Sequence, residues 1–81
     1  MKDKAYHIRD RFPDKKNSID LLMAKDTEFL ALCADYDVCV DAVRYWAESK
    51  EPEAKTRVNE YLALIRELED EINQALIRMK Q

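Results

Sequence analysis

Residues 52–79 read PEAKTRVNEYLALIRELEDEINQALIRM, and this stretch decides the fold. Apolar residues repeat along it with a period of seven, on two heptad positions three residues apart, and no polar residue interrupts either series. The stretch therefore predicts one long helix, from Pro52 to about Met79, with a continuous apolar seam for a partner helix. The first series is Val58, Ile65, Ile72 and Met79, and the second is Ala54, Tyr61, Leu68 and Ala75.

The preceding residues, 18–48, carry a second seam with the same period. Lys25 occupies a seam position, and Asp26-Thr27-Glu28 follows it as a helix N-cap with an acid in the first turn. We therefore expect a first long helix over residues 18–48 with a kink near residues 25–26, where the helix can end and restart. The seam consists of Leu22, Phe29, Tyr36 and Val43, with Leu32, Cys39 and Trp46 three residues later in the heptad.

A short connector, residues 49–53, joins the two predicted helices. Pro52 disfavours helical backbone at Glu51 and is tolerated in a first helical turn, so it ends one helix and opens the next. Helices joined this closely pack as antiparallel neighbours. The sequence contains no glycine, which disfavours tight β-hairpins. The predicted fold is a single all-α domain over residues 1–81, an antiparallel, coiled-coil-like helical hairpin that assembles into a helical bundle.

Residues 1–14 precede the hairpin as a basic arm or short helix. Residues 1–16 contain six bases and three acids, whereas the rest of the chain contains eight bases and fourteen acids. Because the net charge is −3, we favour an arm that is solvated or docks on the acidic body of the chain. Pro13 fixes the approach to the next helix, for which Asn17 or Ser18 is the expected N-cap. The arm has three apolar residues that can fold back over the hairpin: Tyr6, Ile8 and Phe12.

Residues that invite a catalytic or metal-site interpretation lack the companions such sites need. Cys33 and Cys39 lie about 9 Å apart along one helix, too far for a disulfide, and are expected to be buried, reduced thiols. His7 has no CxxC or HxxxH companion and is expected to be an exposed arm residue. The acidic run at residues 67–71 fans out around the helix by about 100° per residue, so it is expected to be solvated. The sequence predicts no catalytic, cofactor-binding or metal-ligating residue.

Apolar residues outside the seams widen the hydrophobic surface beyond what one partner helix covers. They are Leu21, Leu30, Val38, Val40, Tyr45, Leu62, Leu64, Leu76 and Ile77. We expect the arm to cover part of this surface and a second copy of the hairpin to cover the rest, in a four-helix arrangement. The residues predicted to form the protein-interaction surface are Leu30, Val38, Tyr45, Leu64 and Ile77.

A pattern that extends from about Arg9 to Met79 resembles a known family. The pair Phe12-Pro13 precedes the series Leu22, Asp26, Phe29, Leu32 and Tyr36, and Leu68, Glu71 and Ile72 close the pattern. In this the chain resembles the YdcH-like small bacterial proteins, a domain family of unknown function. The resemblance implies a small, self-associating helical hairpin with no established enzyme activity and no catalytic residues to carry over. Residues 38–40 and 43–54 depart from the family pattern, so the loop end is expected to have a different partner surface.

The sequence also restricts the location of the protein. No stretch approaches the roughly 18 unbroken apolar residues of a membrane span. Residues 1–9 lack the apolar core of a signal peptide. We therefore expect a cytoplasmic protein that does not enter the membrane.

The leading functional hypothesis is a non-enzymatic interaction protein that self-associates as a dimer or tetramer or binds another helical protein. The alternative is a nucleic-acid-associated regulator, although the negative net charge argues against it. A small helical enzyme would need polar groups on the inward seam, and the seam of residues 52–79 is apolar apart from the Tyr61 hydroxyl. The regulator would use the six bases of the N-terminal segment: Lys2, Lys4, Arg9, Arg11, Lys15 and Lys16.

Overall fold

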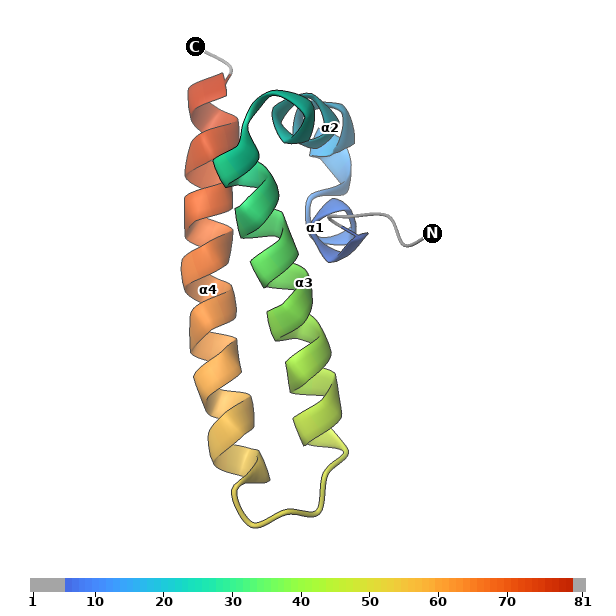
Figure 1. The fold of residues 1–81 in the computed structure, drawn as a ribbon, viewed down its shortest axis with the longest axis vertical. Helices are drawn as coiled ribbons and strands as arrows, with labels where there is room; N and C mark the ends of the chain where they lie inside the picture. Colours follow the sequence, from blue (N-terminus) through green and yellow to red (C-terminus); the bar gives the residue numbers. More distant parts are fainter. Residues whose placement is uncertain (1–5, 80–81) are drawn as a thin grey trace.

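The computed structural model describes residues 6–79, which form helices and no strand. The α-helices are α1 (Tyr6–Arg11), α2 (Lys16–Lys25), α3 (Thr27–Ala47) and α4 (Ala54–Met79), and a 3-10 helix, η1 (Pro13–Lys15), lies between α1 and α2. The helices α3 and α4 pack against each other as an antiparallel hairpin (Figure 1). This confirms the prediction of an all-α helical hairpin. None of the helices within residues 6–79 combines the length and the apolarity needed to cross a membrane.

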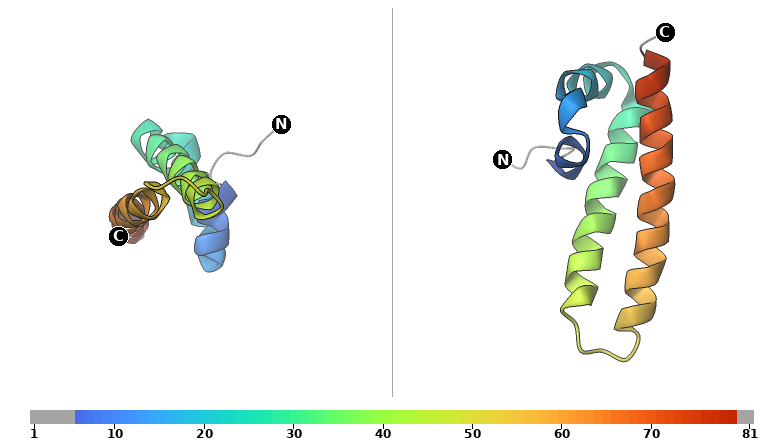
Figure 2. Two further views of the ribbon diagram at one scale, coloured as in Figure 1. Left: turned by 90° about the horizontal axis from the view of Figure 1, so that it is seen from below. Right: turned by 180° about the vertical axis from the view of Figure 1, so that it is seen from behind.

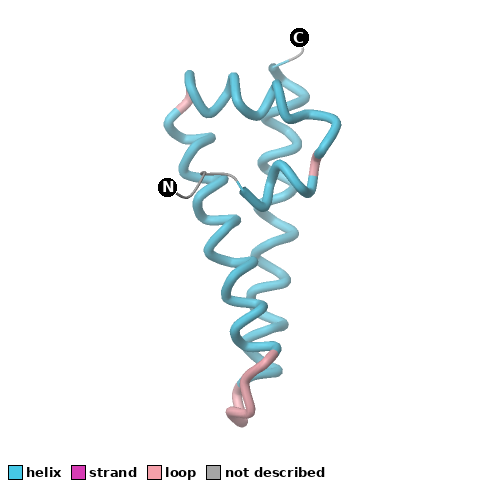
Figure 3. The backbone as a smooth tube through the Cα atoms, turned by 90° about the vertical axis from the view of Figure 1, so that its right-hand side faces the viewer, coloured by secondary structure: helices cyan, strands magenta, loops and turns pink. Residues whose placement is uncertain are grey.

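The two short helices cover one half of the hairpin, the half remote from the connector at residues 48–53. Helix α2 contacts both α3 and α4, whereas α1 packs on α3. Seen from behind, α1 and α2 again lie beside one end of the hairpin (Figure 2, right). In the described part of the chain, the loop-end half therefore consists of α3 and α4 without a third helix (Figure 3).

The hydrophobic core lies in the covered half and draws on all four α-helices. Its members are Ile8, Ile19, Phe29, Cys33, Tyr36, Ile72 and Leu76. Five of these side chains have no exposed surface, and each large aliphatic side chain among them stabilises the fold by about 1.5–3 kcal/mol relative to an exposed position. In the loop-end half Ala54 is buried, whereas the larger seam residues Val43, Trp46, Val58 and Tyr61 are half-buried. The apolar seam between α3 and α4 thus continues to the loop end, whereas the fully buried core is confined to the half that α1 and α2 cover.

The predicted first long helix is divided in two at Asp26. Its backbone is extended there, with φ −128° and ψ 107°, and its carboxylate caps α3. The Oδ1 atom of Asp26 accepts hydrogen bonds from the backbone N–H groups of Glu28, at 2.9 Å, and Phe29, at 3.3 Å. An N-cap cannot itself have helical backbone, so the chain breaks at this position and α3 leaves in a new direction.

The expected cap at Asn17 or Ser18 is wrong. Pro13 opens η1, and the backbone at Lys16 is already helical, so α2 begins directly where η1 ends. Asn17 and Ser18 therefore lie inside the first turn of α2, which has no side-chain cap. At the other end of the hairpin, α4 begins at Ala54, two residues after Pro52.

Candidate protein-interaction surface

The five residues predicted to form the interaction surface do not lie together. Val38 and Tyr45 on α3 are each 64% exposed, and Leu64 and Ile77 on α4 are 44% and 47% exposed. Leu30 is half-buried, so less of its side chain is accessible to a partner than in the other four residues. The thirteen residues from Leu64 to Ile77 correspond to about 220° of helical rotation, so these two side chains leave α4 on different sides.

Val38 and Leu64 line one groove between α3 and α4, with a volume of about 360 Å³. The apolar side chains in it are Val38, Cys39, Leu64 and Leu68, of which Cys39 is buried and Leu68 half-buried. Three carboxylates complete the lining, and no basic side chain of the described residues belongs to it. We call this groove, lined by Asp35, Val38, Cys39, Leu64, Glu67, Leu68 and Glu71, the acidic groove.

A row of apolar side chains also follows the outer surface of α3. Ala31, Val38 and Tyr45 are seven residues apart and all three are exposed, and Ala42 between them is half-buried. Tyr45 contacts Trp46 edge to face, with ring centroids 5.1 Å apart and planes at 85°. We call Ala31, Val38, Ala42 and Tyr45 the α3 stripe. Its spacing is that of a coiled-coil seam, in which the exposed Asp35 takes the position between Ala31 and Val38. No element of the described chain covers Val38 and Tyr45, which are each 64% exposed.

A second hollow of about 420 Å³ lies at the loop end of the hairpin. Its apolar lining comes from Trp46, Ala47, Pro52, Ala54 and Val58, and the charged side chains in it are Lys50, Glu51 and Lys55. The half-buried Trp46 is exposed to this hollow because the third helical layer ends before the loop. The loop end therefore combines an aromatic side chain with two lysines and one glutamate, whereas the charged side chains of the acidic groove are all carboxylates.

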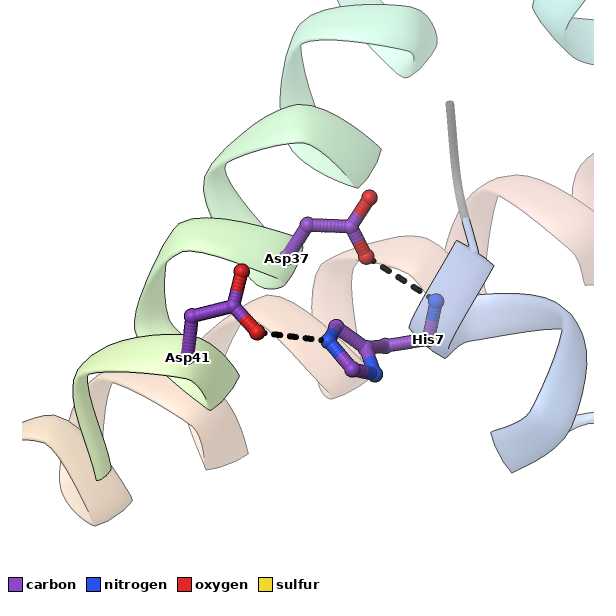
Figure 4. A network of polar contacts seen from close by, with 3 residues as sticks. All are labelled: His7, Asp37 and Asp41. Atoms are coloured by element: carbon purple, nitrogen blue, oxygen red, sulfur yellow. Dashed lines mark hydrogen bonds and ion pairs between the residues drawn. The ribbon is translucent and has the colours of Figure 1, made fainter. Parts of the chain in front are cut away.

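The prediction that His7 is exposed is wrong, since only 8% of its surface is accessible. Figure 4 shows His7 of α1 between two aspartates of α3. Its backbone N–H donates to Oδ1 of Asp37 at 3.0 Å, and its ring Nε2 lies 3.0 Å from Oδ1 of Asp41. The sequence pattern missed this burial because the partners lie 30 and 34 residues away. His7 therefore fastens α1 to α3.

Arginines of the basic arm pair with carboxylates of the same chain. Arg9 pairs with Asp20 of α2, and Nε of Arg11 donates to Oε2 of Glu69 on α4 at 3.1 Å. Residues 6–15 thus dock on the acidic body, one of the two arrangements that the sequence left open, and Lys2 and Lys4 lie outside the described residues. The charge that Arg9 and Arg11 can offer to a phosphate backbone is correspondingly reduced.

Glu69 departs from the expectation that residues 67–71 form a solvated acidic face. Its carboxylate is 21% exposed and accepts both the Arg11 hydrogen bond and one from the Tyr36 hydroxyl at 2.7 Å. Burial, together with this hydrogen bond, raises the pKa of Tyr36 above its ordinary value. Glu69 of α4 is thus bonded to Tyr36 of α3 and to Arg11 of α1.

Leu76, which the heptad pattern assigns to the surplus apolar surface, is fully buried. The heptad describes contact with one partner helix, whereas α2 packs on the same end of the hairpin and widens the buried face of α4. Ile8 of the arm is also fully buried in this core. The N-terminal segment thus covers part of the surplus apolar surface. Ile8 and Phe12 pack on the hairpin, as the sequence predicted.

Cys33 and Cys39 are buried, unpaired thiols. Burial and the nearby Asp37 carboxylate raise the pKa of Cys33 to about 12. Burial and Asp35 raise the pKa of Cys39 as well. A raised pKa keeps a thiol protonated and weakly nucleophilic at neutral pH. Within residues 6–79, no group of three histidine, cysteine or acidic side chains is placed to hold a metal ion.

A scan against protein-family models finds no match for the chain, and searches among curated proteins and solved structures find none either. The resemblance to the YdcH-like proteins stays a prediction. The function is therefore inferred from the surfaces described above.

Proposed function

We propose that this chain is a non-enzymatic interaction protein that associates with a second copy of itself through the exposed apolar side chains of its hairpin. One observation carries the proposal: Val38 and Tyr45, one heptad apart on α3, are both 64% exposed. Large apolar side chains at coiled-coil spacing on an outer helix face are typical of a surface that another helix covers.

The architecture of the loop-end half supports the same proposal. A helix layer is stable when its apolar stripe is buried against other elements, and domains usually achieve this with two or more packed layers around a shared core. The loop-end half has one layer of two helices, and its larger seam residues are half-buried. A second hairpin packed on α3 would supply the missing layer and complete a four-helix bundle.

The shape of the α3 stripe favours a second copy as the partner. Its N-terminal end carries Ala31 and its C-terminal end carries Tyr45. A twofold axis that pairs two α3 helices in opposite directions brings the large Tyr45 of each copy toward the small Ala31 end of the other. The sizes of its side chains are therefore complementary in the antiparallel direction.

The test is the solution mass by light scattering over a range of protein concentrations. We expect a dimer or tetramer for the wild type and a shift toward monomer for the double variant Val38→Asp, Tyr45→Lys, which places charges on the α3 stripe. Leu21→Asp with Leu62→Lys is the matched control, because it places the same charges at exposed leucines outside the α3 stripe and the acidic groove. Circular dichroism of each variant checks that the helices are retained. A wild type that is monomeric at every concentration contradicts the proposal, as does a shift that only the control pair produces.

A further inference from the structure

We infer that the acidic groove binds an amphipathic helix with basic flanks, supplied by another protein. This inference rests on the proposal that the chain is an interaction protein and adds a partner of opposite charge. Because Val38 belongs to both the α3 stripe and the acidic groove, the second copy and the basic helix compete, and the helix binds the monomer.

The groove has the dimensions of a helix-binding site. Along α4 it runs from Leu64 to Glu71, which is about 10 Å or two helical turns, and α3 forms the opposite wall. Val38 and Cys39 of α3 and Leu64 and Leu68 of α4 supply its apolar lining. A helix bound in such a groove places apolar side chains at i, i+3 or i+4, and i+7 into it.

The charges of the groove select the partner. Asp35 stands on the α3 wall and Glu67 and Glu71 stand on the α4 wall, so carboxylates flank the apolar centre on both sides. The acidic character continues beyond the groove, since residues 17–81 contain fourteen acids and eight bases. Lysine or arginine side chains on either side of the partner's apolar face would lie next to these carboxylates. This attraction between opposite charges raises the rate of association, and repulsion between like charges disfavours acidic helices.

Two other occupants fit the charges less well. Pairing the groove with the groove of a second copy would bring Glu67 and Glu71 of the two copies together, and like charges in contact oppose binding. The two arginines of the N-terminal segment are engaged elsewhere, because Arg9 pairs with Asp20 and Arg11 pairs with Glu69. A basic helix from a different protein is the occupant that the apolar centre and the carboxylates both favour.

The experiment measures binding of a labelled peptide to the full-length protein by fluorescence anisotropy, at a protein concentration where light scattering gives the monomer mass. The probe is a peptide of about 18 residues with leucine at i, i+3 or i+4, and i+7 and lysine elsewhere. Two matched peptides serve as controls, one with glutamate in place of every lysine and one with the same composition in scrambled order. We expect saturable binding of the lysine peptide alone, weakened as salt rises from about 50 mM to about 500 mM.

Protein variants locate the binding site. We expect Glu67→Gln with Glu71→Gln to weaken binding by about tenfold. The charge-matched control Glu53→Gln with Asp70→Asn, at two exposed acids outside the groove, is expected to change binding less than about twofold. Leu64→Gln should likewise reduce binding, whereas Leu62→Gln should not, although the two leucines are exposed to 44% and 42% on the same helix.

Three results would overturn the inference: no binding of the lysine peptide, equal binding of the scrambled peptide, or equal loss in the matched control variants. If Glu67→Gln with Glu71→Gln raises the solution mass and Leu64→Gln lowers it, the groove is occupied by a second copy and the inference is also wrong. Self-association through the α3 stripe is judged separately, from the mass of the wild type. The two proposals can therefore fail independently.

Discussion

The hydroxyl of Tyr36 on α3 donates a hydrogen bond of 2.7 Å to the carboxylate of Glu69 on α4, in the interior of the hairpin. Tyr36 is 4% exposed, and the same Glu69 oxygen accepts from Nε of Arg11 on α1. The carboxylate of Glu69 thus links three helices through side chains that are at least 25 positions apart in the sequence. The apolar contacts between α3 and α4 do not by themselves fix how the two helices are aligned. The Tyr36–Glu69 hydrogen bond can form in only one alignment of α3 along α4, so it favours that register.

Tyr36→Phe removes this hydrogen bond and retains the ring. We expect the free energy of unfolding to fall by about 1.5 kcal/mol, because the lost bond is to a charged acceptor with little exposure to water. Denaturant titration followed by Trp46 fluorescence measures it. Tyr61→Phe is the matched control, since this half-buried tyrosine of α4 has no hydroxyl hydrogen bond among the described residues, and its change should be below about 0.5 kcal/mol. Equal effects of the two substitutions would contradict a specific contribution from the Tyr36–Glu69 bond.

Asp26→Ala removes the side-chain cap of α3. Two backbone N–H groups lose their acceptor, so we expect a loss of about 1 kcal/mol and a lower thermal midpoint. Asp26→Ser supplies another capping oxygen and is expected to retain most of the stability. If the alanine and serine variants melt at the same temperature, the cap does not stabilise the break between α2 and α3.

Ile8→Ala tests the docking of α1. Ile8 has no exposed surface, so its truncation should cost about 2–4 kcal/mol through lost burial and the cavity that remains. Leu21→Ala, at a leucine of α2 that is 50% exposed, should cost less than about 0.5 kcal/mol. Both values come from denaturant unfolding at one protein concentration. A change below about 0.5 kcal/mol for Ile8→Ala would show that α1 is not packed on the hairpin in solution.

Because the thiol of Cys33 is buried, we expect the free energy of unfolding to fall at alkaline pH. Burial and Asp37 raise its pKa from 9.0 to about 12, so between these values the unfolded chain releases the thiol proton and the folded chain keeps it. The folded state then binds more protons, and the free energy of unfolding falls with rising pH by up to about 1.4 kcal/mol per pH unit. Tyr36, whose pKa is also raised, adds to this fall at the upper end.

Denaturant titrations from about pH 8 to about pH 11 measure this slope in the wild type and in Cys33→Ala. The variant is expected to be less stable at neutral pH, because it leaves a small cavity, and to show a shallower decline above pH 9. An unchanged slope in Cys33→Ala would mean that the thiol is not buried in the folded protein.

The local sequence determined the helices and most of their ends. The uninterrupted seven-residue period of residues 54–79 requires a helix with one apolar face, and the structure has α4 over these residues. Asp26 after Lys25 places the break between α2 and α3, because an N-cap residue with an acceptor side chain is recognised from a few neighbouring positions. These signals are readable because each acts over one or two helical turns.

Only the tertiary structure decided which side chains the N-terminal segment covers. Leu76 and His7 are buried because α2 and α1 fold onto one half of the hairpin, a placement fixed by contacts such as His7–Asp37 and Arg11–Glu69 between residues 30 and 58 positions apart. A heptad pattern describes one helix against one partner and carries no information on a third. The same placement leaves Val38, Tyr45 and Leu64 exposed, because α1 and α2 are too short to reach both sides and the loop end of the hairpin.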